Sequence, residues 1–239
     1  MVIPLYKGGK TLPNVVERIP KEIPTKILIV DDGSPDNSYE VAKSIASKNP
    51  KIIVFKHEKN RGYGGAQKTL FNEALKRGAD IVVLLHQDGQ YAPEDMPRLI
   101  SPVLEDETID IVLGSRTKML EGGMPPIKFI GNKIITFLQN LALNTRFKEF
   151  HTGYRVYTAN ALRRLDYEAC TNDLHFDTEI LVDAVRKKLR VVEVPIKTYY
   201  GKEVTQTQKI VTYGLNCLKA TWMYRLEILL SKFSFRDFL

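Results

Sequence analysis

The first half of the chain alternates short apolar runs with segments in which apolar residues recur at helical spacing. The short runs predict strands, and the longer periodic segments predict amphipathic helices. Repeated strand–helix alternation indicates an α/β fold in which a mostly parallel central sheet carries helices on both faces. The expected strands are residues 2–6, 26–30, 51–55, 80–85 and 109–113, and the expected helices are residues 11–19, 37–48, 62–76 and 93–104.

The alternation weakens after residue 116. We expect a glycine- and proline-rich loop over 121–126, helices over 129–143 and 176–187, and strands at 156–157 and 190–196. Apolar and basic residues alternate over 209–235, which predicts a basic amphipathic helix or helix pair. The chain therefore divides into a domain over 1–204 and a helical appendage over 205–239. The appendage either lies on a membrane surface, packs on its own domain or pairs with a second copy in a homodimer, and the pattern leaves these alternatives open.

Two apolar runs end in polar groups that suit a ligand site. Residues 81–85 lead directly into His86, Gln87, Asp88, Gly89 and Gln90, and residues 26–30 lead into Asp31 and Asp32. An apolar run without a polar break is typical of a strand buried on both faces. The carboxyl ends of such strands open into the crevice where α/β sheets bind ligands, and carboxylate and amide oxygens suit Mg²⁺ or Mn²⁺. We therefore predict a site for a divalent cation and a diphosphate.

Five short motifs follow one another along the chain: Asp31-Asp32-Gly33-Ser34, Asn60-Arg61-Gly62, Asp88-Gly89-Gln90, Gly114-Ser115-Arg116 and Thr152-Gly153-Tyr154-Arg155. In this order and spacing they resemble family 2 glycosyltransferases of the GT-A fold, in particular the dolichyl-phosphate mannose and glucose synthases. The resemblance covers roughly residues 1–200. It implies inverting transfer of a sugar from a UDP- or GDP-linked donor to a polyprenyl (dolichyl) phosphate at the membrane surface.

The resemblance also implies roles for individual residues. The metal ligands for Mg²⁺ or Mn²⁺ would be Asp88, Gln90 and His86. The acceptor would contact Lys128, Lys133 and Arg155, and the catalytic groups would be Asp88, Asp177 and Arg116. The donor nucleotide would contact Pro4, Tyr6, Asp31, Asp32, Arg61, Gly62, Gln87 and Asp88.

Several of these positions have alternative explanations. The family's first acidic metal position is His86 here, which either binds the ion or phosphate or is a packed strand-end residue. Arg116 ends a buried strand and needs an anion, either a substrate phosphate or a structural partner such as Asp31 or Asp88. Asp177 and Glu179 lie two residues apart at a helix start, so only one of them points into the site. A hydroxyl acceptor requires a general base, for which Asp177 is the candidate, whereas a phosphate acceptor requires none.

Composition narrows the classes of partner. The formal charge of +7 and the pI near 9.2 favour anionic ligands, but the basic residues are not gathered with aromatic ones, so we expect no nucleic-acid binding. Two cysteines and four scattered histidines show no disulfide or zinc spacing. No signal-peptide pattern or run of ~20 apolar residues is present, so we expect a cytoplasmic protein, either free or peripheral at the inner face of the cell membrane.

Three other activities remain open from the sequence. The acceptor could be a hydroxyl of a glycan or glycolipid rather than a phosphate. Nucleotidyl transfer to a sugar phosphate would use a glycine- and lysine-bearing loop after the first strand, which residues 6–10 superficially offer. A non-catalytic nucleotide-sugar-binding protein is suggested by His86 and by the missing acidic residue near Tyr6.

Overall fold

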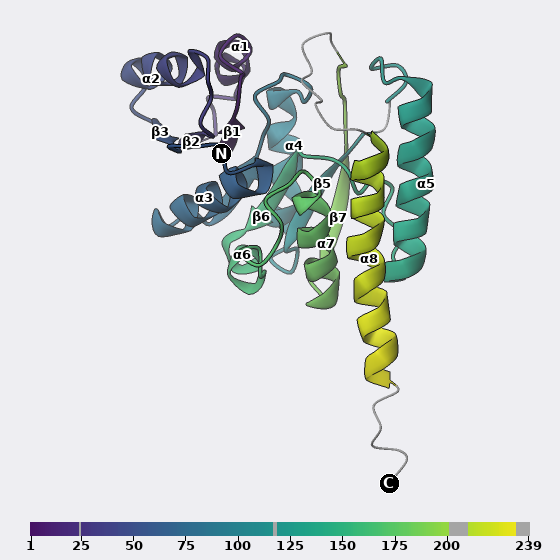
Figure 1. Ribbon diagram of the computed structural model, residues 1–239. Helices are drawn as coiled ribbons and strands as arrows, with labels where there is room; N and C mark the ends of the chain where they lie inside the picture. The colour runs from purple at the N-terminus through teal and green to yellow at the C-terminus, as the bar shows by residue number, and fades with distance from the viewer. Residues whose placement is uncertain (24, 117–118, 201–209, 233–239) are drawn as a thin grey trace.

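The computed structural model describes residues 1–23, 25–116, 119–200 and 210–232 (Figure 1). Its centre is one sheet with the strand order β3-β2-β1-β4-β6-β5-β7. Only β6 runs antiparallel to its neighbours within this sheet, which confirms the mostly parallel α/β fold. The strands are β1 (Val2–Leu5), β2 (Ile27–Asp31), β3 (Ile52–Lys56), β4 (Ile81–Leu84), β5 (Ile111–Arg116), β6 (Arg155–Thr158) and β7 (Val191–Ile196).

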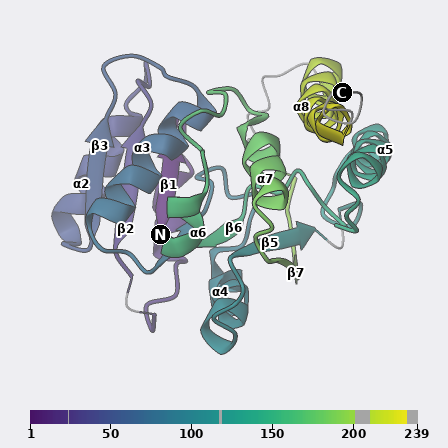
Figure 2. The same cartoon turned by 90° about the horizontal axis from the view of Figure 1, so that it is seen from below.

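Helices cover both faces of the sheet, as Figures 1 and 2 show. Three helices, α3, α6 and α7, pack on one face, and α1, α2 and α4 pack on the other. The remaining two, α5 and α8, lie side by side beyond the β7 end of the sheet, where α8 also contacts α7. The helices are α1 (Leu12–Glu17), α2 (Ser38–Lys48), α3 (Tyr63–Lys76), α4 (Met96–Glu105), α5 (Pro126–Leu143), α6 (Ala159–Arg164), α7 (Phe176–Arg186) and α8 (Ile210–Lys232), with a 3₁₀ turn, η1 (Pro93–Asp95), before α4.

The apolar runs of the sequence form strands that are buried on both sides. Successive residues of a strand point to opposite faces, so Leu28 and Val30 pack towards α3 while Ile27 and Ile29 pack towards α1 and α2. All four side chains are at most 6% exposed. Two hydrophobic layers, one on each face, therefore hold the sheet in place and explain why no polar residue interrupts these runs.

Most expected elements form close to their expected positions, with three differences. The strand expected at 109–113 is shifted and runs over Ile111–Arg116, because its ladder with β7 continues to the pair Arg116 and Ile196. The short helix α6 was not expected. The appendage forms a single helix, α8, over its described part, while the boundary expected at 204 lies outside the described residues.

The order of the strands determines where a ligand can bind. β2 and β3 lie on one side of β1, and β4 lies on the other, so the chain reverses direction across the sheet between β1 and β4. Open α/β sheets bind ligands at the carboxyl ends of the strands where the strand order reverses in this way. Within the described residues, none of the helices combines the length and the apolar content that a bilayer span requires.

Candidate active site

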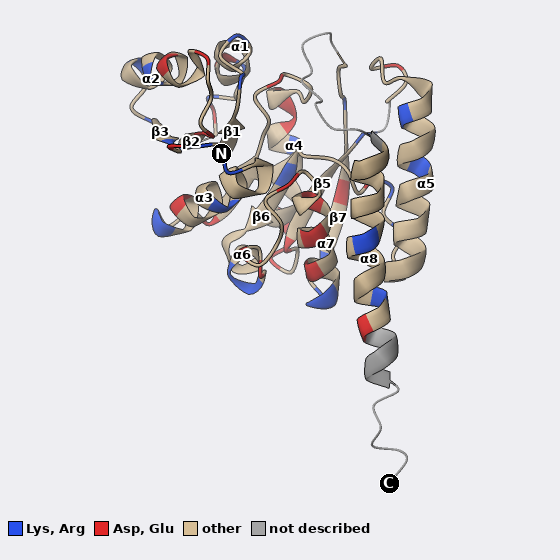
Figure 3. Ribbon diagram, in the orientation of Figure 1, with Lys and Arg blue, Asp and Glu red and all other residues tan. Residues whose placement is uncertain are grey.

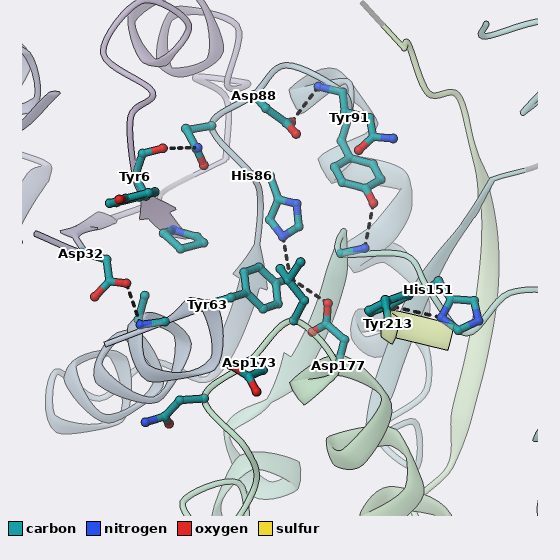
Figure 4. A pocket seen from close by; sticks show the side chains of 18 of the residues that line it. Tyr6, Asp32, Tyr63, His86, Asp88, Tyr91, His151, Asp173, Asp177 and Tyr213 are labelled. Atoms are coloured by element: carbon teal, nitrogen blue, oxygen red, sulfur yellow. Dashed lines mark hydrogen bonds between the residues drawn. The ribbon is translucent and has the colours of Figure 1, made fainter. Parts of the chain in front are cut away.

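A cavity of about 530 Å³ opens at the carboxyl ends of β1, β2 and β4 and extends towards α5, α7 and α8. Figure 4 shows that its wall brings together side chains from distant parts of the chain. Asp32 and Asp88, which follow two different strands, both line this cavity, as we predicted for carboxylates at the ends of parallel strands. The expected site residues in its wall are Pro4, Tyr6, Asp32, Gly62, His86, Gln87, Asp88, Gln90, Arg116, Lys128 and Asp177.

Asp32 organises the loop that precedes α3. Its Oδ1 accepts hydrogen bonds from His57 Nδ1 at 2.6 Å and from the Arg61 backbone N–H at 2.9 Å, and its Oδ2 accepts from the Gly62 N–H at 3.0 Å. Gly62 has a φ of 88°, and a Cβ there would lie 2.5 Å from the Asn172 carbonyl oxygen. The carboxylate thus holds the loop in a shape that requires glycine.

Two further residues that we expected to contact the nucleotide, Asp31 and Arg61, lie outside the cavity wall. Asp31 is fully buried, and its Oδ2 accepts a hydrogen bond from the Ser34 N–H at 3.2 Å. Its Oδ1 has no hydrogen-bond partner among the described residues. Arg61 contributes its backbone N–H to Asp32, while its side chain is not in the wall. Between the two aspartates it is therefore Asp32 that faces the ligand space.

Asp88 lines the cavity at the end of β4. Its Oδ1 accepts from the Gln90 backbone N–H at 3.0 Å, whereas its Oδ2 receives no hydrogen bond from the described residues. Gln90 is 5% exposed, and its buried Nε2 has no hydrogen-bond partner in the part of the chain that the structure describes. No three His, Cys, Asp or Glu side chains gather as ion ligands among the described residues. Mg²⁺ and Mn²⁺ need only one or two carboxylates when a substrate supplies phosphate oxygens, so the open oxygen of Asp88 fits such an ion.

His86 belongs to a hydrogen-bonded chain across the cavity. The Tyr63 hydroxyl donates to Asp177 Oδ2 at 2.7 Å, and the same hydroxyl lies 2.8 Å from His86 Nε2. The Tyr63 hydroxyl has one proton, and it donates this proton to Asp177. The hydrogen bond between Tyr63 and His86 must therefore be donated by Nε2–H of His86. Burial, followed by the charge of Asp177, raises the pKa of Tyr63 well above its usual value and keeps it protonated. This Nε2 is therefore not available to a metal ion.

The two acidic residues in the first turn of α7 point in different directions, as their spacing predicts. Asp177 lines the cavity and also accepts from Gln67 Nε2 at 3.3 Å. Glu179 instead accepts from the Thr171 backbone N–H at 2.6 Å, outside the cavity wall. The first carboxylate is thus the one placed to meet an acceptor.

Arg116 is buried and already has an anionic partner. Its Nε and Nη2 donate to the two oxygens of Glu149 at 3.1 and 2.8 Å, and its Nη1 donates to the Tyr200 hydroxyl at 2.8 Å. Burial would raise the pKa of Glu149, but the charge and hydrogen bonds of Arg116 outweigh it and hold that pKa at about 2. The structural partners suggested by the sequence, Asp31 and Asp88, are wrong, because the counter-ion is Glu149.

The three basic residues expected to bind the acceptor lie in different places. Lys128 of α5 lines the cavity, whereas Lys133 lies outside its wall and donates to the Lys148 carbonyl oxygen at 3.4 Å. Arg155 is 1% exposed, and its guanidinium donates to backbone carbonyl oxygens at 2.7–2.9 Å, among them that of Asp177. Arg155 therefore lies behind the cavity wall, where it supports the start of α7 instead of touching a ligand.

One end of the cavity contains polar atoms without protein partners. Asn132 Oδ1 and His151 Nε2 are both buried there and receive no hydrogen bond from the described residues. Asn132 Nδ2 donates to Glu149 at 3.0 Å, and His151 Nδ1 lies 3.1 Å from the hydroxyl of Tyr213 on α8. Burial lowers the pKa of His151 to about 4, so the imidazole is neutral near pH 7. This end of the cavity thus presents a neutral imidazole and an amide oxygen.

Several of these residues were missed by the sequence reasoning. Tyr63, Tyr91 and His151 each lie directly beside one of the five motifs, and this proximity was a usable signal. The others lie in the wall because of long-range packing, which no local sequence pattern indicates. The residues in question are Tyr63, Tyr91, Asn132, His151, Asp173 and Tyr213.

Comparison with solved structures confirms the GT-A arrangement of sheet and helices. Glucosyl-3-phosphoglycerate synthase from Mycobacterium tuberculosis superposes with a TM-score of 0.70 at 17% identity, over 93% of this chain and 78% of that chain. The same enzyme has been solved with Mn²⁺ and UDP-glucose, and that structure superposes with a TM-score of 0.69 at 18% identity over 94% and 78% of the two chains. At these identities the likeness concerns the fold alone.

Sequence comparison is more specific. The chain is 35% identical to a UDP-N-acetylglucosamine–dolichyl-phosphate N-acetylglucosaminyltransferase of Methanococcus voltae over 84% of this chain and 85% of that one. It is 32% identical to an undecaprenyl-phosphate mannosyltransferase of Micrococcus luteus over 87% and 85%. The model of the family described as glycosyl transferase family 2 matches residues 1–166. The chain therefore belongs to glycosyltransferase family 2 and is a glycosyltransferase.

Proposed function

We propose that this glycosyltransferase moves a sugar, with inversion, from a nucleotide-diphosphate sugar to a polyprenyl phosphate. The observation that carries the proposal is the single cavity that joins Asp32 and Asp88 at the strand ends to Lys128 of α5. The named activities of the relatives from Methanococcus voltae and Micrococcus luteus support the acceptor class. Because this acceptor is held in a membrane, the protein would act at the cytoplasmic face of the cell membrane.

The donor nucleotide would occupy the end of the cavity formed by β1, β2 and the start of α3. Asp32 fixes the backbone there, and Tyr6 and Gly62 complete the wall. This end suits the nucleotide moiety of a UDP- or GDP-linked sugar.

Asp88, together with the diphosphate of the donor, would hold Mg²⁺ or Mn²⁺, and Gln90 would supply the neighbouring polar group. When bound, such an ion neutralises the negative charge that develops on the leaving diphosphate. The protein's own contribution is to keep one oxygen of Asp88 directed into the cavity while the Gln90 N–H holds the other. His86, whose Nε2 donates to Tyr63, would orient Tyr63 rather than bind the ion.

The hydrogen bonds of Asp177 favour a phosphate acceptor over a hydroxyl acceptor. One of its oxygens accepts from Tyr63 and the other from Gln67, and the Arg155 guanidinium lies 4.0 Å away. Because both oxygens already hold protein donors, an acceptor hydroxyl would have to compete with Tyr63 and Gln67 for this carboxylate. A phosphate monoester is already anionic and needs no base. Asp177 would then position the acceptor, next to Lys128.

A transfer assay tests the proposal directly. The purified chain would be incubated with Mn²⁺, a short-chain polyprenyl phosphate and, in turn, UDP-glucose, UDP-N-acetylglucosamine and GDP-mannose, and the glycolipid product would be identified by mass spectrometry. We expect product from at least one donor and a loss of about 100-fold or more for Asp88→Asn. Transfer only to a lipid or glycan hydroxyl would refute the phosphate acceptor, and no transfer with any donor would favour a non-catalytic nucleotide-sugar-binding protein.

A further inference from the structure

Helix α5 turns its most apolar side towards solvent. Five large apolar side chains of α5 are spaced three or four residues apart, so they form one stripe along the helix. All of them are more than half exposed, and Ile127 reaches 79%. The stripe consists of Ile127, Ile130, Ile134, Phe137 and Leu141.

Helix α8 repeats this arrangement beside α5. Its exposed apolar residues again recur mostly at helical spacing on the outer side, and Val211 is 73% exposed. Figures 1 and 2 both show α5 and α8 lying next to each other, away from the sheet. We call the two stripes together the outer face; its α8 part consists of Val211, Leu215, Trp222, Met223 and Leu226.

The buried positions of the same helices are mostly polar or small, with Leu143 of α5 as an exception. Thr136 and Gln139 of α5 and Thr221 of α8 are at most 5% exposed, and Gln139 Nε2 donates to Thr221 Oγ1 at 3.2 Å. A helix in water normally buries its apolar stripe and exposes its polar one. Helices that pack through small and polar residues while presenting apolar ones outward are typical of a hydrocarbon environment.

The charges around the outer face select between two possible occupants. Lys133, Lys219 and Arg225 lie on or beside the stripes, against one acidic residue, Glu227; Figure 3 shows these helices mostly uncharged with a few basic positions. In a symmetric pair of chains the same basic patch would meet its own copy, which like charges oppose. An anionic lipid surface instead attracts each of these residues.

The outer face is continuous with the cavity. The cavity wall includes residues of both helices that do not belong to the two stripes. These residues are Lys128, Asn132 and Ile135 of α5 and Tyr213 of α8. A surface on which the outer face rested would therefore lie next to the end of the cavity where the proposed acceptor enters.

We propose that the outer face of α5 and α8 docks on an anionic lipid bilayer. Both helices lie in the interfacial layer, with the apolar stripes among the upper acyl chains and the basic residues at the headgroups. This docking does not depend on the acceptor chemistry, so it can be tested apart from the transfer reaction.

Vesicle co-sedimentation of the full chain tests the proposal. We expect binding to vesicles of phosphatidylcholine with about one third phosphatidylglycerol, and at least about tenfold weaker binding to pure phosphatidylcholine. The triple substitution Ile130→Gln, Ile134→Gln and Phe137→Gln removes three exposed apolar side chains and should weaken vesicle binding by about 100-fold. Because none of these side chains lies in the cavity wall, UDP-sugar binding by thermal shift should remain unchanged.

Leu104→Gln is the matched control, because Leu104 is 64% exposed on α4, outside the outer face. It should bind vesicles as the unsubstituted chain does. Equal vesicle binding by the triple variant would overturn the proposal, as would no binding of the unsubstituted chain to anionic vesicles. A dimer in solution that the triple substitution splits, with vesicle binding unaltered, would assign the outer face to a second copy instead. Loss of vesicle binding together with intact transfer to a short-chain acceptor in detergent supports docking and leaves the proposed function standing.

Discussion

The substitution Asp177→Asn separates the two acceptor classes, because each predicts a different loss of rate. Tyr63 now donates to Oδ2 at 2.7 Å and Gln67 donates to Oδ1 at 3.3 Å, and the asparagine keeps a carbonyl oxygen for only one of these two donors. Rotation of the Tyr63 hydroxyl allows it to accept from the new amide N–H, so about one charge-assisted hydrogen bond is weakened, at a cost of roughly 1–1.5 kcal/mol. With a phosphate acceptor, kcat should therefore fall by about tenfold or less.

The same substitution removes a general base if the acceptor is a hydroxyl. Such a base contributes about 10²–10⁴ to the rate, so the two outcomes do not overlap. The assay measures kcat and KM for transfer of radiolabelled sugar, in detergent, to whichever acceptor the purified chain uses, a short-chain polyprenyl phosphate or a lipid or glycan hydroxyl, at saturating donor and Mn²⁺. Glu179→Gln is the control, since Glu179 lies on the same helix but accepts from the Thr171 N–H outside the cavity wall. A loss of about 10² or more in Asp177→Asn, with Glu179→Gln unaffected and both proteins folded, would refute the positioning role.

Three further perturbations test the rest of the site. Glu149→Gln removes the anion that faces buried Arg116, so the free energy of unfolding in urea should fall by about 3–5 kcal/mol; an unchanged midpoint would contradict the buried ion pair. Burial holds the pKa of His151 at about 4, below its usual 6.5. Between pH 6.5 and pH 4 the unfolded chain therefore binds a proton that the folded protein does not bind. The free energy of unfolding should be highest above pH 6.5 and should decrease by about 3 kcal/mol as the pH falls to 4. His151→Gln should flatten this part of the stability–pH curve, and an unaltered slope would show that another group titrates there. Gly62→Ala sets a methyl group against the Asn172 carbonyl oxygen at a φ of 88°, so it should lower both the Tm and the thermal shift caused by UDP; a normal shift would separate this loop from nucleotide binding.

The carboxylates at the strand ends could be predicted from the sequence, because their position depends only on the residues next to them in the chain. An apolar run that ends in a carboxylate places that carboxylate at the end of a buried strand, and parallel strands bring such ends to one edge of the sheet. This reasoning brought Asp32 and Asp88 to one cavity. The spacing of Asp177 and Glu179 likewise predicted that only one of them would face inward. The identity of the inward-facing residue depended on how α7 packs.

The partners of the buried charges could not be predicted in this way. Glu149 neutralises Arg116 from 33 positions along the chain, and His57 binds Asp32 from 25 positions away. Neither pair leaves a periodic or motif signal, because a buried ion pair depends on two side chains meeting in three dimensions. The link from His86 through Tyr63 to Asp177, which takes His86 Nε2 away from a metal ion, has the same origin.

The sequence by itself determined the alternation of strands and helices, the fold class and the chemistry at the strand ends, since these follow from hydrophobic periodicity and chain connectivity. Only the tertiary structure decided that β6 enters the sheet antiparallel between β4 and β5, and that α8 contributes Tyr213 to the cavity. It also decided which side of α5 and α8 faces outward. A helical period fixes the stripes on a helix, but the direction each stripe faces depends on which neighbours the rest of the chain supplies.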